Sequence, residues 1–332
     1  MKAVVMKATG GPDVLETQEM PTYEITADDQ VLVRLKAAGV NPVDVKLREG
    51  SYPVSNLPTI LGWDCAGVVE AVGPAVTAVK PGDEVYAMYG SFGNPEAQGT
   101  YADYALMHER NVAPKPALLS FAEAAAVPLV LLTAWEALLD RARLQAGQTV
   151  LIQAGAGGVG HLAVQLAANA GATVYTTVGS PKKAAWVKKL GATEAILYKE
   201  TDVVAAVMDL TGGQGVDVGL DILGGPLFEA TIPAVKHYGD LVTLLIPPPG
   251  VNLAPARMRN LRLGFEIVLA PLVQGLTEHQ ARQRDILTEA AALFDRGALK
   301  THVSRTFPLE EVSAAHEAIA EGSTTGKIVL LI

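Results

Sequence analysis

TVLIQAGAGGVGHLAVQLAANAGA, residues 149–172, runs from an apolar segment through a glycine-rich turn into a helix with an apolar face. The apolar, β-branched run Thr149–Ala154 predicts a buried parallel strand. Apolar residues then recur at helical spacing over His161–Ala170, and Gly171 is typical of a helix end. A strand, a tight turn and a helix in this order form the local frame of a dinucleotide-binding site.

The turn has the G-x-G-x-x-G spacing of dinucleotide-binding loops. Gly155 is expected to make the tight turn, Gly157 to let a pyrophosphate approach the backbone, and Gly160 to let the helix pack closely. Amides at the helix N-terminus attract phosphate. The predicted cofactor loop comprises Gly155, Ala156, Gly157, Gly158, Val159 and Gly160. A glycine-rich packing turn without a ligand is the alternative interpretation of the same motif.

The end of the second strand indicates which dinucleotide is bound. Enzymes that use NAD usually place Asp or Glu there to bind the ribose 2′-hydroxyl. Here the strand Thr173–Val178 is followed by Gly-Ser180-Pro-Lys182-Lys183, which contains no acid and two lysines. Hydroxyl donors and positive charge suit a 2′-phosphate, so Ser180 and Lys183 are predicted to bind NADP(H) rather than NAD(H). The alternative is that both lysines are ordinary solvated residues in the first turn of a helix.

The composition is that of a globular protein with two domains. The chain has 332 residues, of which 49% are hydrophobic and 18% charged, enough for two cores. The formal net charge of −9 argues against a nucleic-acid or anionic-membrane partner. Apolar runs such as Ala124–Leu132 are too short for a membrane span, and the N-terminus has no signal-peptide pattern. With one cysteine, Cys65, an intramolecular disulfide is excluded, and the expected location is cytoplasmic.

Periodicity divides the chain into a β-rich part and an alternating part. The first 115 residues contain short strands separated by turns, of which Gln30–Ala38 is the clearest. Ser120 and Glu123 predict a capping box at the start of a helix. From residue 149 to residue 245 strands and helices alternate, which is typical of a doubly wound parallel sheet. A helix at Glu278–Phe294 and a strand at Lys327–Ile332 follow, so the fold class is α/β.

Motifs along the whole chain resemble one family. They are AAGVNPVDVKLREGSYP (37–53), LGWDCAGVVEAVG (61–73), VKPGDEVYAM (79–88), GTYADYAL (99–106), PLVLLTAWEALL (128–139), QAGAGGVGHLAVQLA (153–167), GVDVGLDILGG (215–225) and TGKIVLL (325–331). The chain resembles the zinc-free quinone oxidoreductases, the zeta-crystallin-like branch of the medium-chain dehydrogenase/reductase superfamily. The resemblance implies a GroES-like β domain at 1–123 and 272–332 and a Rossmann domain at 124–271. It also implies NADPH and substrate in the cleft between these domains, usually in a homodimer.

The same resemblance shows where the chain departs from zinc-dependent members of the superfamily. Those proteins carry Cys at the position of Asn41, Gly-His-Glu at Gly62-Trp63-Asp64, and four cysteines in a lobe near 88–100. Here Cys65 is the only cysteine, and the six histidines show no ligand spacing. A catalytic zinc takes about three protein ligands and a structural zinc four, so no metal is expected. Cys65 is expected to be a buried packing residue rather than a reactive thiol.

Without a metal, the acceptor must be one that needs little activation. A quinone, or an alkene conjugated to a carbonyl, accepts hydride when a hydrogen-bond donor polarises its oxygen. By resemblance, Asn41 sits beside the nicotinamide and Tyr52 lies in the cleft, and both side chains can donate. The alternatives are that Asn41 is an Asn-Pro turn residue and Tyr52 a packed loop aromatic. Asp44 is expected to start a helix or to be a structural partner rather than to act as an acid.

Further cofactor contacts follow from the resemblance alone. Thr133 falls in the Thr-Ala pair beside the cofactor, and Leu223 and Gly224 would close over the nicotinamide ribose. Lys183 and Tyr198 align with the positions that hold the 2′-phosphate and adenosine end. The candidate apolar walls of the substrate pocket are Trp63, Tyr89, Phe92 and Phe265.

These observations lead to one hypothesis and two alternatives for the function. The hypothesis is an NADPH-dependent, zinc-free oxidoreductase that transfers hydride to a quinone or enone. The alternatives are an alkenal or enoyl-thioester double-bond reductase on the same fold, and a non-catalytic NADPH-binding protein. Nothing in the sequence separates quinone from alkene reduction. The scattered Arg257, Arg259 and Arg262 do not make the polybasic groove that a thioester's nucleotide tail would favour.

Overall fold

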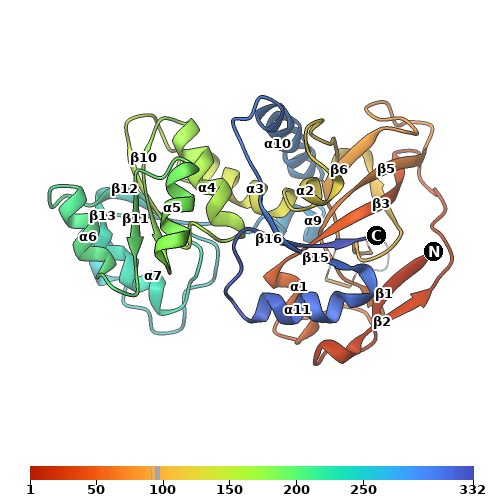
Figure 1. Cartoon of the computed structure of the whole chain (residues 1–332), viewed down its shortest axis with the longest axis horizontal. Coiled ribbons are helices and arrows are strands. Elements are labelled where there is room, and N and C mark those ends of the chain that lie inside the picture. Colours follow the sequence, from red (N-terminus) through yellow and green to blue (C-terminus); the bar gives the residue numbers. More distant parts are fainter. Residues whose placement is uncertain (91, 94–97) are drawn as a thin grey trace. The chain divides into compact units, whose positions relative to one another are not determined.

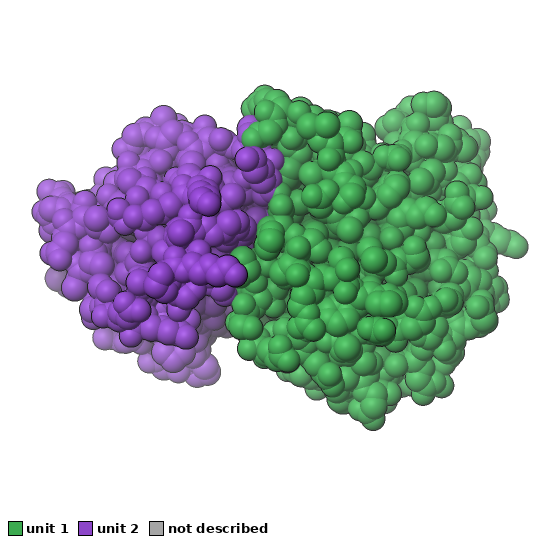
Figure 2. All heavy atoms as spheres, viewed as in Figure 1, with its two compact units in different colours: residues 1–129, 269–297, 301–332 green, residues 130–268, 298–300 purple. Residues whose placement is uncertain are grey.

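The computed structural model describes residues 1–90, 92–93 and 98–332, and its chain divides into two compact units (Figure 1, Figure 2). The segments of unit 1 are 1–129, 269–297 and 301–332, and those of unit 2 are 130–268 and 298–300. The family resemblance implies boundaries at 123/124 and 271/272, whereas the units divide at 129/130 and 268/269. The first boundary lies later because the short helix α2 (Phe121–Ala125) packs on strands of unit 1.

Unit 2 is built on one six-stranded sheet in which all neighbouring strands are parallel. The strands are β9 (Thr149–Ile152), β10 (Thr173–Val178), β11 (Glu194–Leu197), β12 (Val216–Asp221), β13 (Val235–Thr243) and β14 (Arg262–Phe265). Their spatial order is β11-β10-β9-β12-β13-β14, so the direction of winding reverses between β9 and β12. This is the doubly wound sheet that the sequence predicted. In such sheets ligands bind outside the carboxyl ends of the strands at the switch point.

Helices connect these strands and cover the sheet. They are α3 (Pro128–Trp135), the π-helical segment η3 (Glu136–Arg141), α4 (Gly158–Asn169), α5 (Pro181–Lys189), α6 (Val203–Leu210), α7 (Pro226–Thr231), the 3₁₀ turn η4 (Ile232–Ala234) and α8 (Ala254–Met258). The sequence pattern predicts a helix over Thr133–Asp140; in the structure this helix begins earlier, at Pro128, and changes to π-helix at Glu136. The sheet and helices bury a core that includes Leu151, Val207, Val216, Phe228 and Leu241.

Unit 1 consists mainly of antiparallel strands in two sheets. The three-stranded sheet contains β1 (Lys2–Met6), β2 (Leu15–Glu19) and β4 (Thr59–Ile60). The seven-stranded sheet contains β3 (Gln30–Val40), β5 (Asp64–Val72), β6 (Glu84–Met88), β7 (Tyr104–His108), β8 (Val112–Pro114), β15 (Val303–Pro308) and β16 (Lys327–Leu331). Its order is β15-β16-β3-β5-β6-β8, with β7 also paired to β3.

Short helices connect these strands, and one long helix follows the return of the chain to unit 1. They are η1 (Pro12–Val14), α1 (Pro42–Arg48), η2 (Glu109–Asn111), α2, α9 (Ala270–Val273), α10 (Thr277–Asp295), η5 (Leu309–Glu311) and α11 (Val312–Ala320). The capping box predicted at Ser120 is present, because Ser120 Oγ accepts from the Glu123 amide and the Glu123 carboxylate accepts from the Ser120 amide. Among the described residues, no helix is long and apolar enough to cross a membrane.

The C-terminal strand β16 completes the sheet of unit 1 beside β3 (Figure 1). The register pairs Ile328 with Val40, and on the other side of β3 it pairs Gly39 with Asp64 of β5. Residues from the two ends of the chain are therefore side by side at one end of three adjacent strands. This register positions the polar cluster described below.

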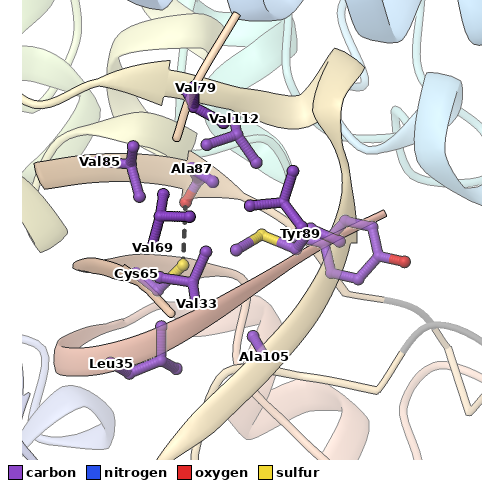
Figure 3. Packing of buried hydrophobic residues seen from close by; sticks show 12 residues of the cluster. Val33, Leu35, Cys65, Val69, Val79, Val85, Ala87, Tyr89, Ala105 and Val112 are labelled. Carbon is purple, nitrogen blue, oxygen red and sulfur yellow. Dashed lines mark hydrogen bonds between the residues drawn. The ribbon is translucent and has the colours of Figure 1, made fainter. Parts of the chain in front are cut away.

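Cys65 lies on β5 inside the core of unit 1 (Figure 3). Val33, Val69 and Val85 belong to the same buried cluster, and the thiol lies 3.8 Å from the carbonyl oxygen of Ala87. Burial raises the pKa of the thiol above its ordinary value, with a smaller contribution from the neighbouring Asp64 carboxylate. Cys65 is thus a packing residue, as its sequence context predicted.

Candidate functional site

The loops singled out in the sequence follow the carboxyl ends of neighbouring strands in unit 2. The glycine turn follows β9, the segment with Ser180 follows β10, Tyr198 follows β11, and Leu223 and Gly224 follow β12. Because all these strands are parallel and adjacent, the four segments share one edge of the sheet. That edge includes the switch point between β9 and β12, where a dinucleotide is expected.

The tight turn after β9 depends on Ala154, not on Gly155 as the sequence suggested. Ala154 has the left-handed φ of 49°, and its amide donates to Thr177 Oγ1 at 3.0 Å. Gly155 is required for a different reason. A Cβ there would lie 2.0 Å from the side-chain oxygen of Thr176, which is buried and donates to the Ile152 carbonyl at 2.7 Å.

Of the two later glycines of the motif, Gly160 allows the close helix packing that was expected, and the expected approach of a pyrophosphate at Gly157 stays a prediction. A Cβ on Gly160 would lie 2.2 Å from the carbonyl oxygen of Ala154, so only glycine lets α4 pack on the turn. Gly157 is the N-cap of α4 with φ −81°, and it leaves the helix without a side-chain cap or an acidic first turn. Gly158 and Val159 begin α4, and Ala156 completes the turn. The bare amides and the missing Cβ fit a bound pyrophosphate.

Ser180, Lys183 and Tyr198 come together at the carboxyl ends of β10 and β11. Ser180 is the N-cap of α5, where its hydroxyl accepts from the Lys183 amide at 3.4 Å. The Tyr198 ring lies over Gly179, where a Cβ would be 3.1 Å from the phenol oxygen. Lys183 is half-buried, whereas Lys182 is exposed. Ser180, Lys183 and Tyr198 therefore stand on neighbouring segments, and a hydroxyl, an ammonium and an aromatic ring are groups that suit an adenosine 2′-phosphate.

The sequence analysis missed Asp221, which organises the loop after β12. Asp221 is fully buried, and its Oδ1 accepts from the amides of Leu223 at 3.2 Å and Gly224 at 2.8 Å. Its Oδ2 accepts from Thr243 Oγ1 at 2.7 Å. Position 224 requires glycine, since its φ is +61°. The Leu223 side chain next to it is exposed. The position of an acid at a strand end was the only local signal.

Thr133 lies on α3 in unit 2, where its side chain is buried. Its predicted role beside the cofactor stays a prediction from the resemblance.

In unit 1, Asn41 belongs to a buried polar cluster that sequence reasoning did not assemble. Its Nδ2 donates to Asp64 Oδ2 at 2.9 Å, and its Oδ1 accepts from the Lys327 ammonium. The ammonium also donates to the Val40 carbonyl at 3.0 Å and to Asp64 Oδ2 at 3.2 Å. Burial raises the pKa of Asp64, and the Lys327 charge counteracts that rise.

Asp44 starts α1, as predicted, and it extends the buried cluster. Its Oδ2 accepts from the Asn41 amide at 2.8 Å and from the Tyr101 hydroxyl at 2.9 Å, whereas Oδ1 has no partner among the described residues. Burial raises the pKa of Asp44 to about 7, although these hydrogen bonds oppose the rise. The Tyr101 oxygen also lies 3.4 Å from Nε2 of His316 on α11.

Tyr52 lies beyond the C-terminal end of α1, whereas Asn41 caps its N-terminus. The helix between them is about 10 Å long, and within the described part of the chain no hydrogen bond or ring contact joins the two side chains. The Tyr52 ring instead packs edge-on to Phe92 at 6.2 Å, and the Lys46 ammonium lies 5.7 Å from its centre. The structure therefore does not bring the two predicted catalytic side chains into contact.

The four candidate wall aromatics fall into three environments. The Phe92 ring packs edge-on against both Tyr52 and the buried Trp63, and its centre lies 5.4 Å from that of the Trp63 ring. Tyr89 is buried in the core of unit 1. Phe265 lies on the edge strand β14 of unit 2 and is exposed.

Metal ligands are not grouped anywhere in the part of the chain that the structure describes. Within residues 1–90, 92–93 and 98–332, no three His, Cys, Asp or Glu side chains lie where they could hold one ion. At the positions where zinc-dependent relatives carry ligands, the chain has Asn41, Trp63 and Asp64, with the Lys327 ammonium against two of them.

A doubly wound unit with a glycine turn and, in the same chain, a β unit that carries a buried polar cluster define a nicotinamide-dinucleotide oxidoreductase of the medium-chain type. Family models agree, since the alcohol dehydrogenase GroES-like domain matches residues 27–117 and a zinc-binding dehydrogenase domain matches residues 190–330. A quinone oxidoreductase of Pseudomonas aeruginosa is 34% identical over 333 residues, with 99% of each chain covered. The NADPH-dependent alkenal/one oxidoreductase of Arabidopsis thaliana is 33% identical, over 99% of this chain and 79% of its own length.

Solved structures give the same result over the full chain. The Escherichia coli quinone oxidoreductase complexed with NADPH has a TM-score of 0.88 at 29% identity, and both chains are wholly covered. An NAD-dependent alcohol dehydrogenase also has a TM-score of 0.88, at 36% identity and with both chains wholly covered. The chain therefore belongs to the zinc-free quinone oxidoreductase branch of the medium-chain dehydrogenase/reductase superfamily. It is an oxidoreductase, and its cofactor is a nicotinamide dinucleotide.

Proposed function

We propose that this protein is an NADPH-dependent reductase of quinones and enones. Two polar groups of the chain support this most. The N-terminus of α4 has glycines and no side-chain cap, which suits a pyrophosphate, and the buried Asn41 amide can donate to the acceptor. NADPH supplies a hydride to a carbon conjugated with a carbonyl. The task of the chain is to hold the cofactor at the carboxyl edge of unit 2 and to donate a hydrogen bond to the acceptor oxygen as charge develops there.

The choice of NADPH rests on the end of β10. Ser180 and the half-buried Lys183 meet there, and the first turn of α5 contains no acid. We expect NADPH to bind at least about tenfold more tightly than NADH, which corresponds to about 1.4 kcal/mol. Lys183→Glu should remove most of this preference in calorimetric titrations, because it places a carboxylate against the 2′-phosphate.

Lys182→Glu is the matched control, since it changes charge by the same amount at the adjacent, exposed position. It should change the preference much less. Equal binding of both cofactors by the unmodified protein, or equal effects of the two substitutions, would contradict the assignment of Lys183.

The acceptor class is tested with a panel of quinones and enones, with Tyr52→Phe beside the unmodified protein. Tyr52 is half-buried, and its hydroxyl makes no hydrogen bond to the described residues. Removing a donor to the acceptor oxygen should lower kcat/KM about tenfold, or about 1.4 kcal/mol, with enones affected more than quinones. Cofactor affinity should not change. An unchanged kcat/KM for both acceptor classes would mean that Tyr52 only packs against Phe92 and Lys46.

An alkenal or enoyl-thioester reductase remains the second candidate for the same site, and the Arabidopsis thaliana relative carries an alkenal/one name. A rate with enones and enoyl thioesters but none with quinones would favour it. Absence of any turnover, with NADPH binding intact, would favour a non-catalytic NADPH-binding protein.

We also propose that the protein is a homodimer through the edge strand of unit 2. Among the described residues β14 pairs with β13 alone; Leu263 and Phe265 on this strand, and Ile267 just after it, expose apolar side chains. A second copy of the same edge can pair with it antiparallel about a two-fold axis. Phe265→Asp should shift the sedimentation coefficient to that of a monomer, whereas Tyr238→Asp, at another exposed aromatic, should not. An unmodified protein that sediments as a monomer would reject this interface.

A further inference from the structure

Lys327 joins the first and last thirds of the chain at the buried end of three strands. β16, β3 and β5 are neighbours, and their register places Lys327, Asn41 and Asp64 at the same end (Figure 1). Asn41 and Asp64 are fully buried, and the Lys327 side chain is 4% exposed. An ammonium in such a place must have its three donors satisfied. The Val40 carbonyl, Asn41 Oδ1 and Asp64 Oδ2 provide three acceptors.

These contacts fix the direction of the Asn41 side-chain amide. Its oxygen faces the ammonium, and its nitrogen donates to the Asp64 carboxylate at 2.9 Å. Turning the amide over would place its NH₂ group against an ammonium and its oxygen against a carboxylate. Charge-assisted hydrogen bonds would then be replaced by two repulsive contacts. Asp64 is itself held, because its Oδ1 accepts from the Leu129 amide at 2.7 Å.

One N–H group of the fixed amide has no acceptor among the described residues. An amide nitrogen carries two hydrogens, and Asp64 is the one acceptor that the structure gives to Asn41 Nδ2 among the described residues. A cation on the amide oxygen draws electron density away from the nitrogen, which makes the remaining N–H a better donor. A lysine that only neutralised Asp64 would need no contact with Asn41.

We propose that Lys327 is a positioning residue for acceptor reduction: it holds the Asn41 amide so that nitrogen, not oxygen, is presented to the acceptor. This inference rests on the proposed function, in which Asn41 donates to the acceptor oxygen. Asp64 completes the arrangement from the other end of the amide. Lys327 is 286 residues from Asn41 and 263 from Asp64, its two side-chain partners, so no local motif reveals it.

The test is a double-mutant cycle between the ion pair and Asn41. Lys327→Met alone would leave the Asp64 carboxylate buried without its counterion and could unfold the protein. The variant is therefore Lys327→Met with Asp64→Asn, which removes both charges and keeps an acceptor for the Leu129 amide. Lys115→Met is the matched control, because its side chain is equally buried, in unit 1, and pairs with Glu84 away from Asn41.

We expect the charge-free pair to lower kcat with an enone about tenfold, while KM for NADPH stays within twofold and Lys115→Met stays near the unmodified rate. In an Asn41→Ala background the same pair should cause no further loss. A full rate in the charge-free pair, or losses that multiply with Asn41→Ala, would overturn the proposal.

A second readout does not depend on turnover. The Asn41 side-chain amide should be protected from hydrogen exchange in the unmodified protein and in Lys115→Met, and unprotected in the charge-free pair. If the unmodified protein reduces neither quinones nor enones, the proposed function fails, and amide protection alone would then report whether Lys327 orders Asn41. Unchanged protection in the charge-free pair would show that Lys327 does not hold the amide.

Discussion

Gly160→Ala should destabilise unit 2 and abolish measurable cofactor binding, whereas Gly157→Ala should affect mainly the cofactor. The reason is the direction in which each new methyl group points. On Gly160 it would meet backbone atoms, the Ala154 carbonyl oxygen at 2.2 Å and the Gly155 Cα at 2.7 Å, and neither can move without opening the turn. Overpacking of this kind costs about 3 kcal/mol.

Gly157 offers the matched comparison within the same loop. Its Cβ would lie 3.2 Å from the Ala154 carbonyl oxygen, a contact that small shifts relieve, and its φ of −81° suits alanine. Loss of the glycine N-cap costs about 1 kcal/mol. The methyl group would nevertheless occupy the approach to the uncapped amides of α4, so NADPH affinity should fall about 100-fold, or about 2.7 kcal/mol.

Urea unfolding without cofactor and calorimetric titration with NADPH separate the two effects. In the absence of cofactor, Gly160→Ala should lower the free energy of unfolding by about 3 kcal/mol, and Gly157→Ala by only about 1 kcal/mol. Unaltered NADPH affinity in Gly157→Ala would mean that the pyrophosphate does not lie on this turn. Equal stability of the two variants would mean that the turn yields to the extra methyl group at Gly160.

Local sequence patterns predicted the parts of the fold that depend on near neighbours. The strand Thr173–Val178 has the bounds that the sequence predicts, and the pattern of residues 181–189 likewise predicts the observed helix, because Ser180 and Pro181 mark its start. The apolar stretch Leu261–Leu269 predicts a longer last strand than the structure has, since only Arg262–Phe265 pairs with β13. Pairing, which periodicity does not report, sets that limit.

The candidate site was predictable only where a motif is continuous in sequence. The glycine loop met this condition, although the residue with the left-handed backbone proved to be Ala154. Asp221 and Lys327 did not, because each acts through partners from another strand. The family resemblance pointed to Asn41, but not to the carboxylate and ammonium that fix it, since these meet only when β16 joins β3 and β5.

Asp44 and His316 should contribute opposite and nearly cancelling pH dependence to stability. Both are buried and lie on either side of the Tyr101 hydroxyl. Burial raises the pKa of Asp44 to about 7, since Oδ1 has no partner among the described residues. Burial, with the nearby Arg48 charge, lowers the pKa of His316 to about 3. Between about pH 4 and 6.5 the folded protein therefore keeps a proton on Asp44 and none on His316, the reverse of the unfolded chain.

The sign of each contribution follows from this exchange. A raised carboxyl pKa gives stability that is present below the unfolded value near 4 and lost as pH rises to about 7. A lowered imidazole pKa gives stability that is present above about 6.5 and lost as pH falls to about 3. Between pH 4.5 and 6.0 each group changes the free energy of unfolding by about 2 kcal/mol, in opposite directions.

Single substitutions should reveal the opposite pH dependences of Asp44 and His316, when the free energy of unfolding is measured in urea at pH 4.5 and 6.0. From pH 4.5 to pH 6.0, the free energy of unfolding of Asp44→Asn should rise by about 2 kcal/mol relative to that of the unmodified protein, because the variant lacks the Asp44 contribution that falls with pH. His316→Phe keeps a ring against Tyr101. Its free energy of unfolding should fall by about 2 kcal/mol relative to that of the unmodified protein over the same interval, because the variant lacks the His316 contribution that rises with pH. The double variant should differ from the unmodified protein by an amount that does not change with pH. If both single variants instead run parallel to the unmodified protein, Asp44 and His316 are ionised as a pair in the fold, with Tyr101 between a carboxylate and an imidazolium.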